Sequence, residues 1–475
     1  MRPLQFSKLF ALLPLAITFA AVPASCQGKN PGGAAPSQNV KWDPFLDTLQ
    51  ERTIRWFLDV MPENTGLTPD RWPAQWSPSS IAAVGFGLTT YPIAAEHHMI
   101  TRAEAAARTR TTLRFLLGLR QLPDKTDVGG YKGFFYHFIR KESGAREWNC
   151  ELSTIDTGLL MAGVLFCGSY FDGAGADEAE IRAAADSLYR RVDWTWAMGT
   201  TKGIVMGWKP EEGFHPWVWH GYNEAMIVYI LALGSPTHTV PQAVWDTWTA
   251  TYKWGEHYGQ TLVNFMPLFG HQYSHAWIDF RGIKDSYMSG KGIDYFENSR
   301  RATYVHRSYA TANPHHWIDY SDSIWGLTAC DGPKDTVFTV NGIERKFRSY
   351  SARGTGADEE VDDGTIAPTA AAGSVPFAPE ICIPAVKAMR DRYGDPLWTK
   401  YGFVDAFNPT YITPETPHGW FDRDYLGIDQ GPIVLMIENY RNGFVWNTMK
   451  KNKYIVEGLK RAGFRGGWLE SAGNK

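Results

Sequence analysis

The chain has 475 residues, with 47 Lys or Arg against 50 Asp or Glu, so its formal net charge is −3. A charge this close to zero excludes the strong positive field typical of proteins that bind nucleic acids or anionic membranes, and it favours a neutral partner. Aromatic residues make up 14% of the chain, a content that surfaces for stacking sugar rings explain better than a large core alone.

The N-terminus has the pattern of an export signal. Residues 9–22 form an apolar run that is too short to be a stable membrane anchor. A segment that resembles a bacterial lipobox follows, although Pro23 replaces the usual aliphatic residue: Val22-Pro23-Ala24-Ser25-Cys26. We therefore expect residues 1–25 to be removed, Cys26 to be lipidated and residues 26–42 to form a flexible tether. The mature protein is expected in the periplasm or at the outer membrane.

Motifs of several other classes are absent from the sequence. It contains no Cys-x-x-Cys pair, which excludes zinc-ribbon and thioredoxin sites. It also contains no His-Glu-x-x-His, no phosphate-binding Gly loop and no Gly-x-Ser-x-Gly elbow. The pair His315-His316 is more often ordinary polar structure than a metal site, so the sequence predicts neither a metal nor a cofactor.

Helices with one polar face alternate in the first half of the chain with helices that are apolar on every side. This alternation predicts two layers, with inner helices buried on both faces and outer helices exposed on one. No repeat at a fixed period is present, which excludes a solenoid. The amphipathic segments are 44–60, 102–120, 177–198 and 241–257, and the apolar ones are 79–95, 154–171 and 223–234.

Beyond Thr261 the pattern is looser. Asn341-Gly342 between two short alternating runs predicts a β-hairpin within residues 336–350. The acidic segment 350–377 is predicted to be a loop. Further helices are expected at 285–312, from 321 to 331, 380–393, 430–440 and 444–462. About twelve helices in two layers predict an all-α fold, an (α/α)6 barrel over residues 43–470 with a small β-hairpin excursion.

Three acids stand in the first turn of apolar helices. Asp156 follows Ser153 in a capping-box pattern, so a structural role has about equal weight there. Asp429 is a possible N-cap, and a carboxylate that accepts bonds from helix N–H groups keeps the low pKa that a general base needs. Glu224 follows an aromatic stretch, and it needs a raised pKa if it is a general acid. Burial against aromatic rings favours this, whereas the nearby helix start opposes it.

Glycoside hydrolysis requires two such carboxyl groups, one that protonates the leaving oxygen and one that activates water or attacks. The aromatic stretch before the apolar helix also carries the side chains expected to line sugar subsites. These are Trp217, Trp219, His220 and Tyr222.

Five separated motifs resemble the glucoamylase-like domain of bacterial endo-β-1,2-glucanases, glycoside hydrolase family 144. The resemblance runs from about Asp43 to Leu469. The motifs are Tyr222-Asn223-Glu224-Ala225-Met226, Trp325-Gly326-Leu327-Thr328-Ala329-Cys330-Asp331-Gly332, Asp363-Gly364-Thr365-Ile366-Ala367-Pro368-Thr369-Ala370, Phe377-Ala378-Pro379-Glu380 and Gly427-Ile428-Asp429-Gln430-Gly431-Pro432.

The resemblance implies an (α/α)6 barrel that cleaves β-1,2-glucan within the chain (endo action), with inversion and without a metal, to sophorose-type oligosaccharides. It implies Glu224 as general acid and Asp429 as general base. Separately, we expect a monomer, and the charge balance predicts a neutral polysaccharide or oligosaccharide as its partner. The further residues that the resemblance implies for substrate binding are Glu151, Asp156, Trp277, Arg281, Trp325, Asp331, Glu380 and Trp420.

Three alternatives stay open at this point. Relatives of this domain include exo-acting and transglycosylating forms. A surface lipoprotein that binds glycans without cutting them would also be helical, exported and rich in Trp. A polysaccharide lyase on the same fold would need basic residues to neutralise a uronic acid, which the acidic segment after Ala357 disfavours.

Overall fold

The computed structural model describes residues 41–471 of the chain. The predicted signal segment, Cys26 and nearly all of the predicted tether lie outside these residues. Among residues 41–471, none of the helices combines the length and the apolar character needed to cross a bilayer.

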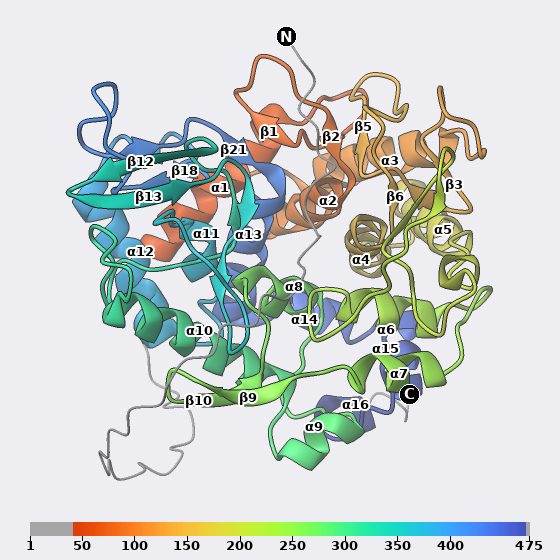
Figure 1. Cartoon of the computed structure of the whole chain (residues 1–475). Coiled ribbons are helices and arrows are strands. Elements are labelled where there is room, and N and C mark those ends of the chain that lie inside the picture. Colours follow the sequence, from red (N-terminus) through yellow and green to blue (C-terminus); the bar gives the residue numbers. More distant parts are fainter. Residues whose placement is uncertain (1–40, 472–475) are drawn as a thin grey trace. The chain divides into compact units, whose positions relative to one another are not determined.

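The described chain is mainly helical, as the sequence predicts (Figure 1). The helices are α1 (Phe45–Val60), α2 (Ile81–Glu96), α3 (Arg102–Gly118), α4 (Thr154–Tyr170), α5 (Ala176–Arg190), α6 (Met226–Gly234), α7 (Ala243–Thr249), α8 (Tyr273–Trp277), α9 (Ser286–Lys291), α10 (Tyr295–Ala312), α11 (Pro368–Ala372), α12 (Pro379–Tyr393), α13 (Gly427–Asn442), α14 (Phe444–Met449), α15 (Lys453–Arg461) and α16 (Gly467–Ser471), with 3-10 turns η1 (Trp196–Met198) and η2 (Leu268–His271).

Short strands in two- and three-stranded sheets connect these helices. They are β1 (Arg71–Trp72), β2 (Ser79–Ser80), β3 (Gly130–Tyr131), β4 (Phe134–Phe135), β5 (Phe138–Ile139), β6 (Leu152–Ser153), β7 (Gly207–Lys209), β8 (Gly213–Phe214), β9 (Trp254–His257), β10 (Gln260–Val263), β11 (Ala329–Cys330), β12 (Thr336–Val340), β13 (Ile343–Phe347), β14 (Ser351–Ala352), β15 (Gly354–Thr355), β16 (Glu360–Val361), β17 (Trp398–Thr399), β18 (Gly402–Phe403), β19 (Phe407–Asn408), β20 (Trp420–Phe421) and β21 (Tyr425–Leu426).

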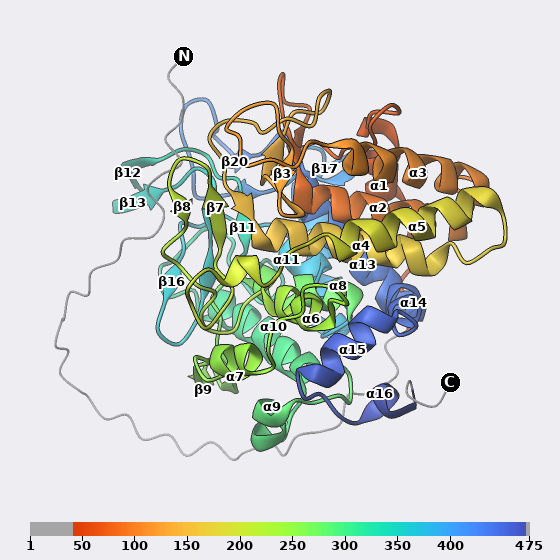
Figure 2. The same cartoon turned by 90° about the vertical axis from the view of Figure 1, so that its right-hand side faces the viewer.

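The helices that are buried almost throughout are α2, α4, α6, α8, α11 and α13. Helix α2 packs against both α4 and α13, α4 also packs against α6, and α11 packs against α13. Gly85 and Gly163 make the α2–α4 approach so close that a Cβ on either would lie within 2.3 Å of a carbonyl oxygen of the other helix. Figure 1 views α2 and α4 end-on, and Figure 2 shows α3 and α5 lying along them.

Backbone hydrogen bonds join the starts of these buried helices. His137 connects two of them, since its carbonyl accepts from Ile81 at the start of α2 and its N–H donates to Glu151 ahead of α4. Asp70 similarly accepts from Gly427, the first residue of α13. We call the residues directly before α2, α4, α6, α11 and α13, together with the short strands that pair there, the helix-start rim. Side chains far apart in the sequence meet at this rim.

Several predicted elements are confirmed. The bounds of α1, α2, α3 and α4 agree with the predicted segments to within about two residues, and α12 and α13 lie where helices are expected. The hairpin is also confirmed, because β12 pairs antiparallel with β13 and Asn341-Gly342 forms the turn between them, both residues at positive φ.

Other predictions are wrong. No helix begins at Ser321. The segment is irregular up to β11, because Gly326 has a φ of 143°, which is incompatible with a helix. The predicted helices 177–198 and 241–257 stop at Arg190 and Thr249, and the second is followed by the hairpin β9–β10. Segments 285–312 and 444–462 each hold two helices, because Gly292 is left-handed and Asn452 caps a new start. The expected loop 350–377 contains three short strands and α11.

Candidate active site

Glu224 lies in the turn before α6 rather than in its first turn. The helix begins at Met226, and Asn223 closes the turn because its side-chain oxygen accepts from the N–H of Ala225 at 3.0 Å. The Glu224 carbonyl accepts from the hydroxyl of Ser274 in α8 at 3.0 Å. Backbone contacts therefore fix the position of Glu224, and its side chain is not needed to hold the turn.

Glu224 is 9% exposed as a residue, and the Oε2 atom of its carboxyl group is buried without a hydrogen-bond partner. Burial raises the pKa of Glu224 to about 7, and the charge of Asp156 adds to the rise. The backbone N–H of Glu224 opposes the rise, as was expected near a helix start, but burial outweighs it. The carboxyl group can therefore hold a proton near neutral pH, as a general acid must.

Asp156 stands beside Glu224 at the start of α4, and it shares a histidine with Glu151. The Nδ1 atom of His137 lies 2.9 Å from Glu151, and its Nε2 atom lies 3.5 Å from Asp156. Burial alone would lower the pKa of His137, but these two acids outweigh it and raise that pKa to about 9. The pKa of Glu151 correspondingly falls to about 2, even though burial opposes the fall. His137 is thus an imidazolium held between two carboxylates.

The capping-box expectation for Asp156 is confirmed, since the Ser153 hydroxyl oxygen accepts from the Asp156 N–H at 3.2 Å and also donates to its carboxylate. Burial raises the pKa of Asp156, and His137 and Ser153 oppose the rise.

Asp429 lies in the first turn of α13, inside the helix and not at its N-cap, which is Leu426. Its Oδ2 atom is buried without a conventional hydrogen-bond partner. Burial raises its pKa to about 8; an interaction with Asp405 opposes the rise, while the charges of Asp331 and Asp70 add to it. The low pKa expected for an N-cap carboxylate is therefore wrong, because other acids and not helix N–H groups surround Asp429.

Asp405, two residues before β19, is the partner with which Asp429 interacts most strongly. Burial and then the charges of Asp429 and Asp331 raise the pKa of Asp405 well above its ordinary value. The two carboxyl groups titrate as one pair that shares protons. Because the pKa of each member is raised, the pair holds a proton more readily than exposed carboxyl groups would.

Asp331, Asp405 and Asp422 form a cluster in which one carboxylate oxygen from each residue lies within 4.8 Å of the other two, the one grouping of this kind found among residues 41–471. Its donor set of hard oxygens suits a cation such as Ca²⁺ or Mg²⁺ in type. Burial and the charges of Asp405 and Asp331 raise the pKa of Asp422 to about 8, so protons also satisfy the cluster at neutral pH. Arg71 pairs with Asp331 at 2.6 Å from the opposite side.

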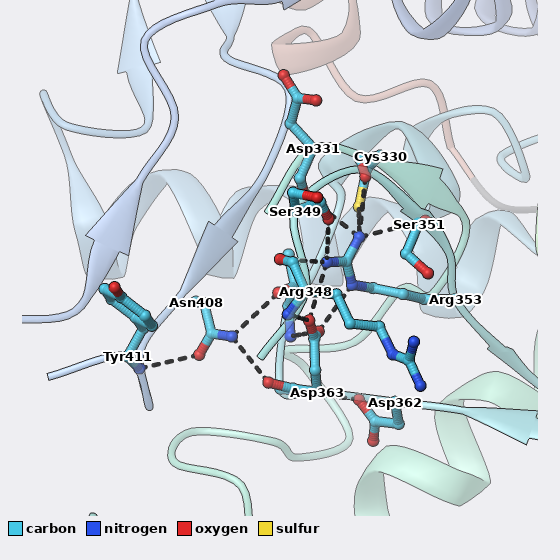
Figure 3. Close-up of polar contacts among 12 residues, drawn as sticks. Cys330, Asp331, Arg348, Ser349, Ser351, Arg353, Asp362, Asp363, Asn408 and Tyr411 are labelled. Atoms are coloured by element: carbon cyan, nitrogen blue, oxygen red, sulfur yellow. Dashed lines mark hydrogen bonds and ion pairs between the residues drawn. The ribbon is translucent and has the colours of Figure 1, made fainter. Parts of the chain in front are cut away.

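A fully buried arginine holds the backbone of this cluster, as Figure 3 shows. The guanidinium of Arg353 pairs with both carboxylate oxygens of Asp363, at 2.7 and 2.9 Å, and donates to several carbonyls, including that of Cys330 at 2.8 Å. The next residue, Asp331, donates its N–H to Oδ2 of Asp405 at 2.8 Å. Arg353 therefore sets the backbone position from which Asp331 reaches the acidic pair.

Tyr273, the first residue of α8, joins the two predicted catalytic acids. Burial raises the pKa of its phenol far above the ordinary value, and the charges of Asp429 and of Glu224 are both among the causes of the rise. Acids 205 positions apart in the sequence therefore both influence one buried phenol at the start of α8.

The aromatic stretch before α6 divides into exposed and buried residues. Trp217 is 46% exposed, and His220 is exposed as well. Trp219 is buried and donates its indole N–H to Thr154 at 2.9 Å, and Tyr222 is buried against the ring of Tyr295. Only Trp217 and His220 of this set present their side chains to solvent.

Four residues expected to bind substrate lie away from the acids or are sealed in the core. Trp277 is fully buried and donates to Thr89, and Trp325 is fully buried as well. Arg281 is paired with Asp279 and covers the ring of Trp446. Glu380 is paired with Arg300 at 2.7 Å, and it acts on Tyr440 near the far end of α13. Their contacts hold them within the fold, and a role in substrate binding stays a prediction for them.

The sequence analysis missed several site residues. Asp405 had a signal, because it is an acid inside the otherwise apolar run Phe403-Val404-Asp405-Ala406-Phe407. His137 had none, since it stands between aromatic residues in an unremarkable segment. Trp420, which was predicted, packs against Cys330, Ala367 and Ala406 beside the acidic cluster.

One groove of about 360 Å³ lies elsewhere, at the far ends of α4 and α13. Tyr170, Asn442 and Phe444 are among its lining residues, and it contains none of the predicted site residues. Its position separates it from the acids at the helix-start rim.

Comparisons with known proteins identify the family of the chain. The Glycoamylase family model, described as "Putative glucoamylase", matches residues 216–453, which include both Glu224 and Asp429. A similar solved structure from Bacteroides uniformis has the same description; it is 30% identical with a TM-score of 0.77, and the match covers 91% of this chain and 100% of the other.

Two further relatives are β-1,2-glucan hydrolases by name. A curated relative from Parabacteroides distasonis, an exo β-1,2-glucooligosaccharide sophorohydrolase (non-reducing end), is 27% identical over 88% of this chain; the chain spans 58% of that relative's length. The endo-β-1,2-glucanase from Chitinophaga pinensis, solved with sophorotriose and glucose, is 27% identical with a TM-score of 0.77, over 89% of this chain and 98% of the other. The chain belongs to the Glycoamylase family.

Proposed function

We propose that the protein is a glycoside hydrolase that cleaves β-1,2-glucan with inversion, to sophorose-type oligosaccharides. The observation that carries the proposal is the pairing of unlike carboxyl groups at one site. Glu224 is buried with one carboxyl oxygen that has no hydrogen-bond partner, and Asp429 is buried beside other acids, among them Asp405 and Asp331. Paired carboxyl groups whose surroundings differ are the machinery that glycoside hydrolysis requires.

In this mechanism Glu224 gives its proton to the oxygen of the departing sugar as the C–O bond breaks. Asp429 accepts a proton from a water molecule, whose oxygen forms the new bond to the anomeric carbon from the opposite face. Asp405 remains protonated beside Asp429, so that the pair carries one negative charge at the moment of attack. Glu224 and Asp429 then exchange protons with solvent and return to their starting states.

The substrate is proposed from two supports. Relatives along nearly the whole chain are named for β-1,2-glucan or its oligosaccharides. The mature chain is close to neutral, which suits an uncharged polymer. Glu151, Asp156, Trp217, His220, Asp331 and Trp420 are the sequence-predicted residues that lie around the acids or on the rim with accessible surface. Product analysis distinguishes cleavage within chains from cleavage at their ends, and both kinds occur among the relatives.

We further propose the closed form of the fold and the location of the protein. Six buried helices that neighbour one another, with α1, α3, α5, α10, α12 and α15 outside them, support an (α/α)6 barrel. The apolar N-terminal run and the lipobox-like segment support export with a lipid on Cys26. Radiolabelled palmitate incorporation that is lost in Cys26→Ala would test this second point.

The proposed function is tested by incubating the purified protein with linear β-1,2-glucan and, separately, with β-1,3- and β-1,4-glucans. Chromatography should show short β-1,2-linked products from the first polymer alone. Proton NMR during the first turnovers should show new reducing ends as α-anomers, the product of inversion. Binding of the glucan without any product would instead identify a glycan-binding protein, and unsaturated products would identify a lyase.

A further inference from the structure

Four tryptophans of the described chain are more than a third exposed: Trp72 at 37%, Trp76 at 56%, Trp148 at 49% and Trp217 at 46%. All four lie in segments that lead into the buried helices α2, α4 and α6, at the helix-start rim. Exposing an indole sacrifices a large amount of favourable burial, and such exposure is typical of binding surfaces. The proposed mechanism uses neither Trp76 nor Trp148.

Trp76 and Trp148 form a pair next to a groove. Their ring centroids are 5.6 Å apart, and the rings meet edge to face. The groove has a volume of about 300 Å³, which is the lower end of the range for small-molecule sites. Trp76 forms one wall, and Arg140, Lys141, Glu142 and Glu147 are among the other lining residues.

The charges in this groove balance, with two cations and two carboxylates, and Arg140 pairs with Glu147 at 2.8 Å. An anionic or cationic ligand would find no net attraction there. A neutral, hydroxyl-rich ligand suits it better, because the indole can cover the apolar face of a sugar ring while the charged groups bond its hydroxyls.

Aromatic contacts lead from this pair directly to the candidate active site. Trp148 packs edge to face on Phe138 with centroids 5.2 Å apart, and Phe138 stacks on His137 at 4.0 Å. His137 is the imidazolium that pairs with Glu151 and Asp156, and Asp156 is the acid beside Glu224. The tryptophan pair is therefore continuous with the reacting acids along one edge of the rim.

We propose that Trp76 and Trp148 form a distal subsite that binds a glucose unit of the β-1,2-glucan chain beyond the bond that is cut. The inference rests on the proposed function and adds the direction in which the polymer leaves the site, over Phe138 toward the loop that contains Trp76. Chains long enough to reach the pair gain affinity from it, whereas the shortest substrates do not contact it.

The test compares kcat/KM for long linear β-1,2-glucan with kcat/KM for the shortest β-1,2-glucooligosaccharide that the wild-type protein cuts. In Trp76→Ala and in Trp148→Ala the ratio of long to short should fall by about five- to tenfold, the loss expected for one stacked ring. Trp76→Phe should recover part of the ratio. Trp468→Ala, which removes a tryptophan from α16 far from the rim, should keep the wild-type ratio.

Unchanged ratios in both alanine variants would overturn the inference, and so would equal losses on long and short chains, which would place the two residues at the reaction centre or in folding. Thermal unfolding of each variant separates the folding case. A wild-type protein that neither binds nor cuts β-1,2-glucan would instead refute the proposed function, and the subsite with it. The wild-type assay therefore distinguishes the two failures.

Discussion

Two buried pairs on neighbouring segments, Arg353–Asp363 and Asp405–Asp429, show opposite uses of buried charge. In the first pair an arginine faces a carboxylate, and every donor of the guanidinium has an acceptor (Figure 3). In the second pair a carboxyl group faces another, and Oδ1 of Asp405 and Oδ2 of Asp429 have no conventional partner. A satisfied buried pair holds its position, whereas an unsatisfied one holds a proton that can move.

The largest expected effect follows from changing the Asp405–Asp429 pair, and it is on turnover. Asp429→Asn keeps the shape of the side chain but removes the group that accepts a proton from water. Hydrolysis of β-1,2-glucan should fall by about a thousandfold, within the range for loss of a general base. Initial rates measure the loss. Circular dichroism and thermal unfolding should match the wild type, and a variant with tens of percent of wild-type activity would remove Asp429 from this role.

The next largest effect is on stability. Arg353→Met removes the cation and leaves the buried carboxylate of Asp363 with backbone N–H donors but no counter-charge, which should lower the free energy of unfolding by about 3–5 kcal/mol. Urea denaturation measures the change. Arg114→Met is the matched control, because Arg114 pairs with Glu180 on the surface and its loss should change stability little. Equal effects of the two substitutions would contradict the assignment of Arg353 as the holder of the acidic cluster.

Glu224→Gln should stabilise the protein in a pH-dependent way. The folded-state pKa of Glu224, about 7, lies above its ordinary value of 4.5, so the folded protein favours the protonated carboxyl group. The stability contributed by that proton is fully present below pH 4.5 and is lost as pH rises through 7. Above pH 7 the Gln variant should exceed the wild type by at most about 3 kcal/mol. The excess should vanish near pH 4, and an excess that does not change with pH would contradict the raised pKa.

The smallest expected effect concerns His137, a cation that lies among carboxylates. His137 faces Glu151, Asp156 and Asp70, and it helps to keep Asp156 ionised. In His137→Gln, Asp156 gains a proton more easily and its charge raises the pKa of Glu224 less. The alkaline limb of the kcat/KM profile should therefore move to lower pH, by less than about one unit. A limb that stays in place would show that His137 has a structural role alone.

The sequence predicted the buried helices well because their signal is local. An apolar run such as that of α4 can only be buried, and its first residue was found through Ser153. Two predicted helices were wrong because single residues, Gly292 and Asn452, divide them. The effect of such a residue depends on the segments around it. The short helix α8 was missed because five residues give no period to recognise.

The site was predicted in part for a related reason. Glu224 and Asp429 could be found because each stands beside an apolar helix in a motif that resembles a known family. Trp277 and Trp325 also lie in aromatic or motif-rich sequence, but tertiary packing buries them completely. The Asp405–Asp429 contact and the role of His137 arise from segments brought together only at the helix-start rim. Contacts between segments so far apart in the chain leave no local signal in the sequence.

The most direct test of the account is the turnover of linear β-1,2-glucan by Glu224→Gln beside the wild-type protein under identical conditions. Glutamine keeps the size and the buried position of the side chain but has no acidic proton to give to the leaving oxygen. The account predicts that hydrolysis falls by about a thousandfold or more while the variant remains folded and still binds the glucan. A folded variant that retains tens of percent of wild-type turnover would contradict it.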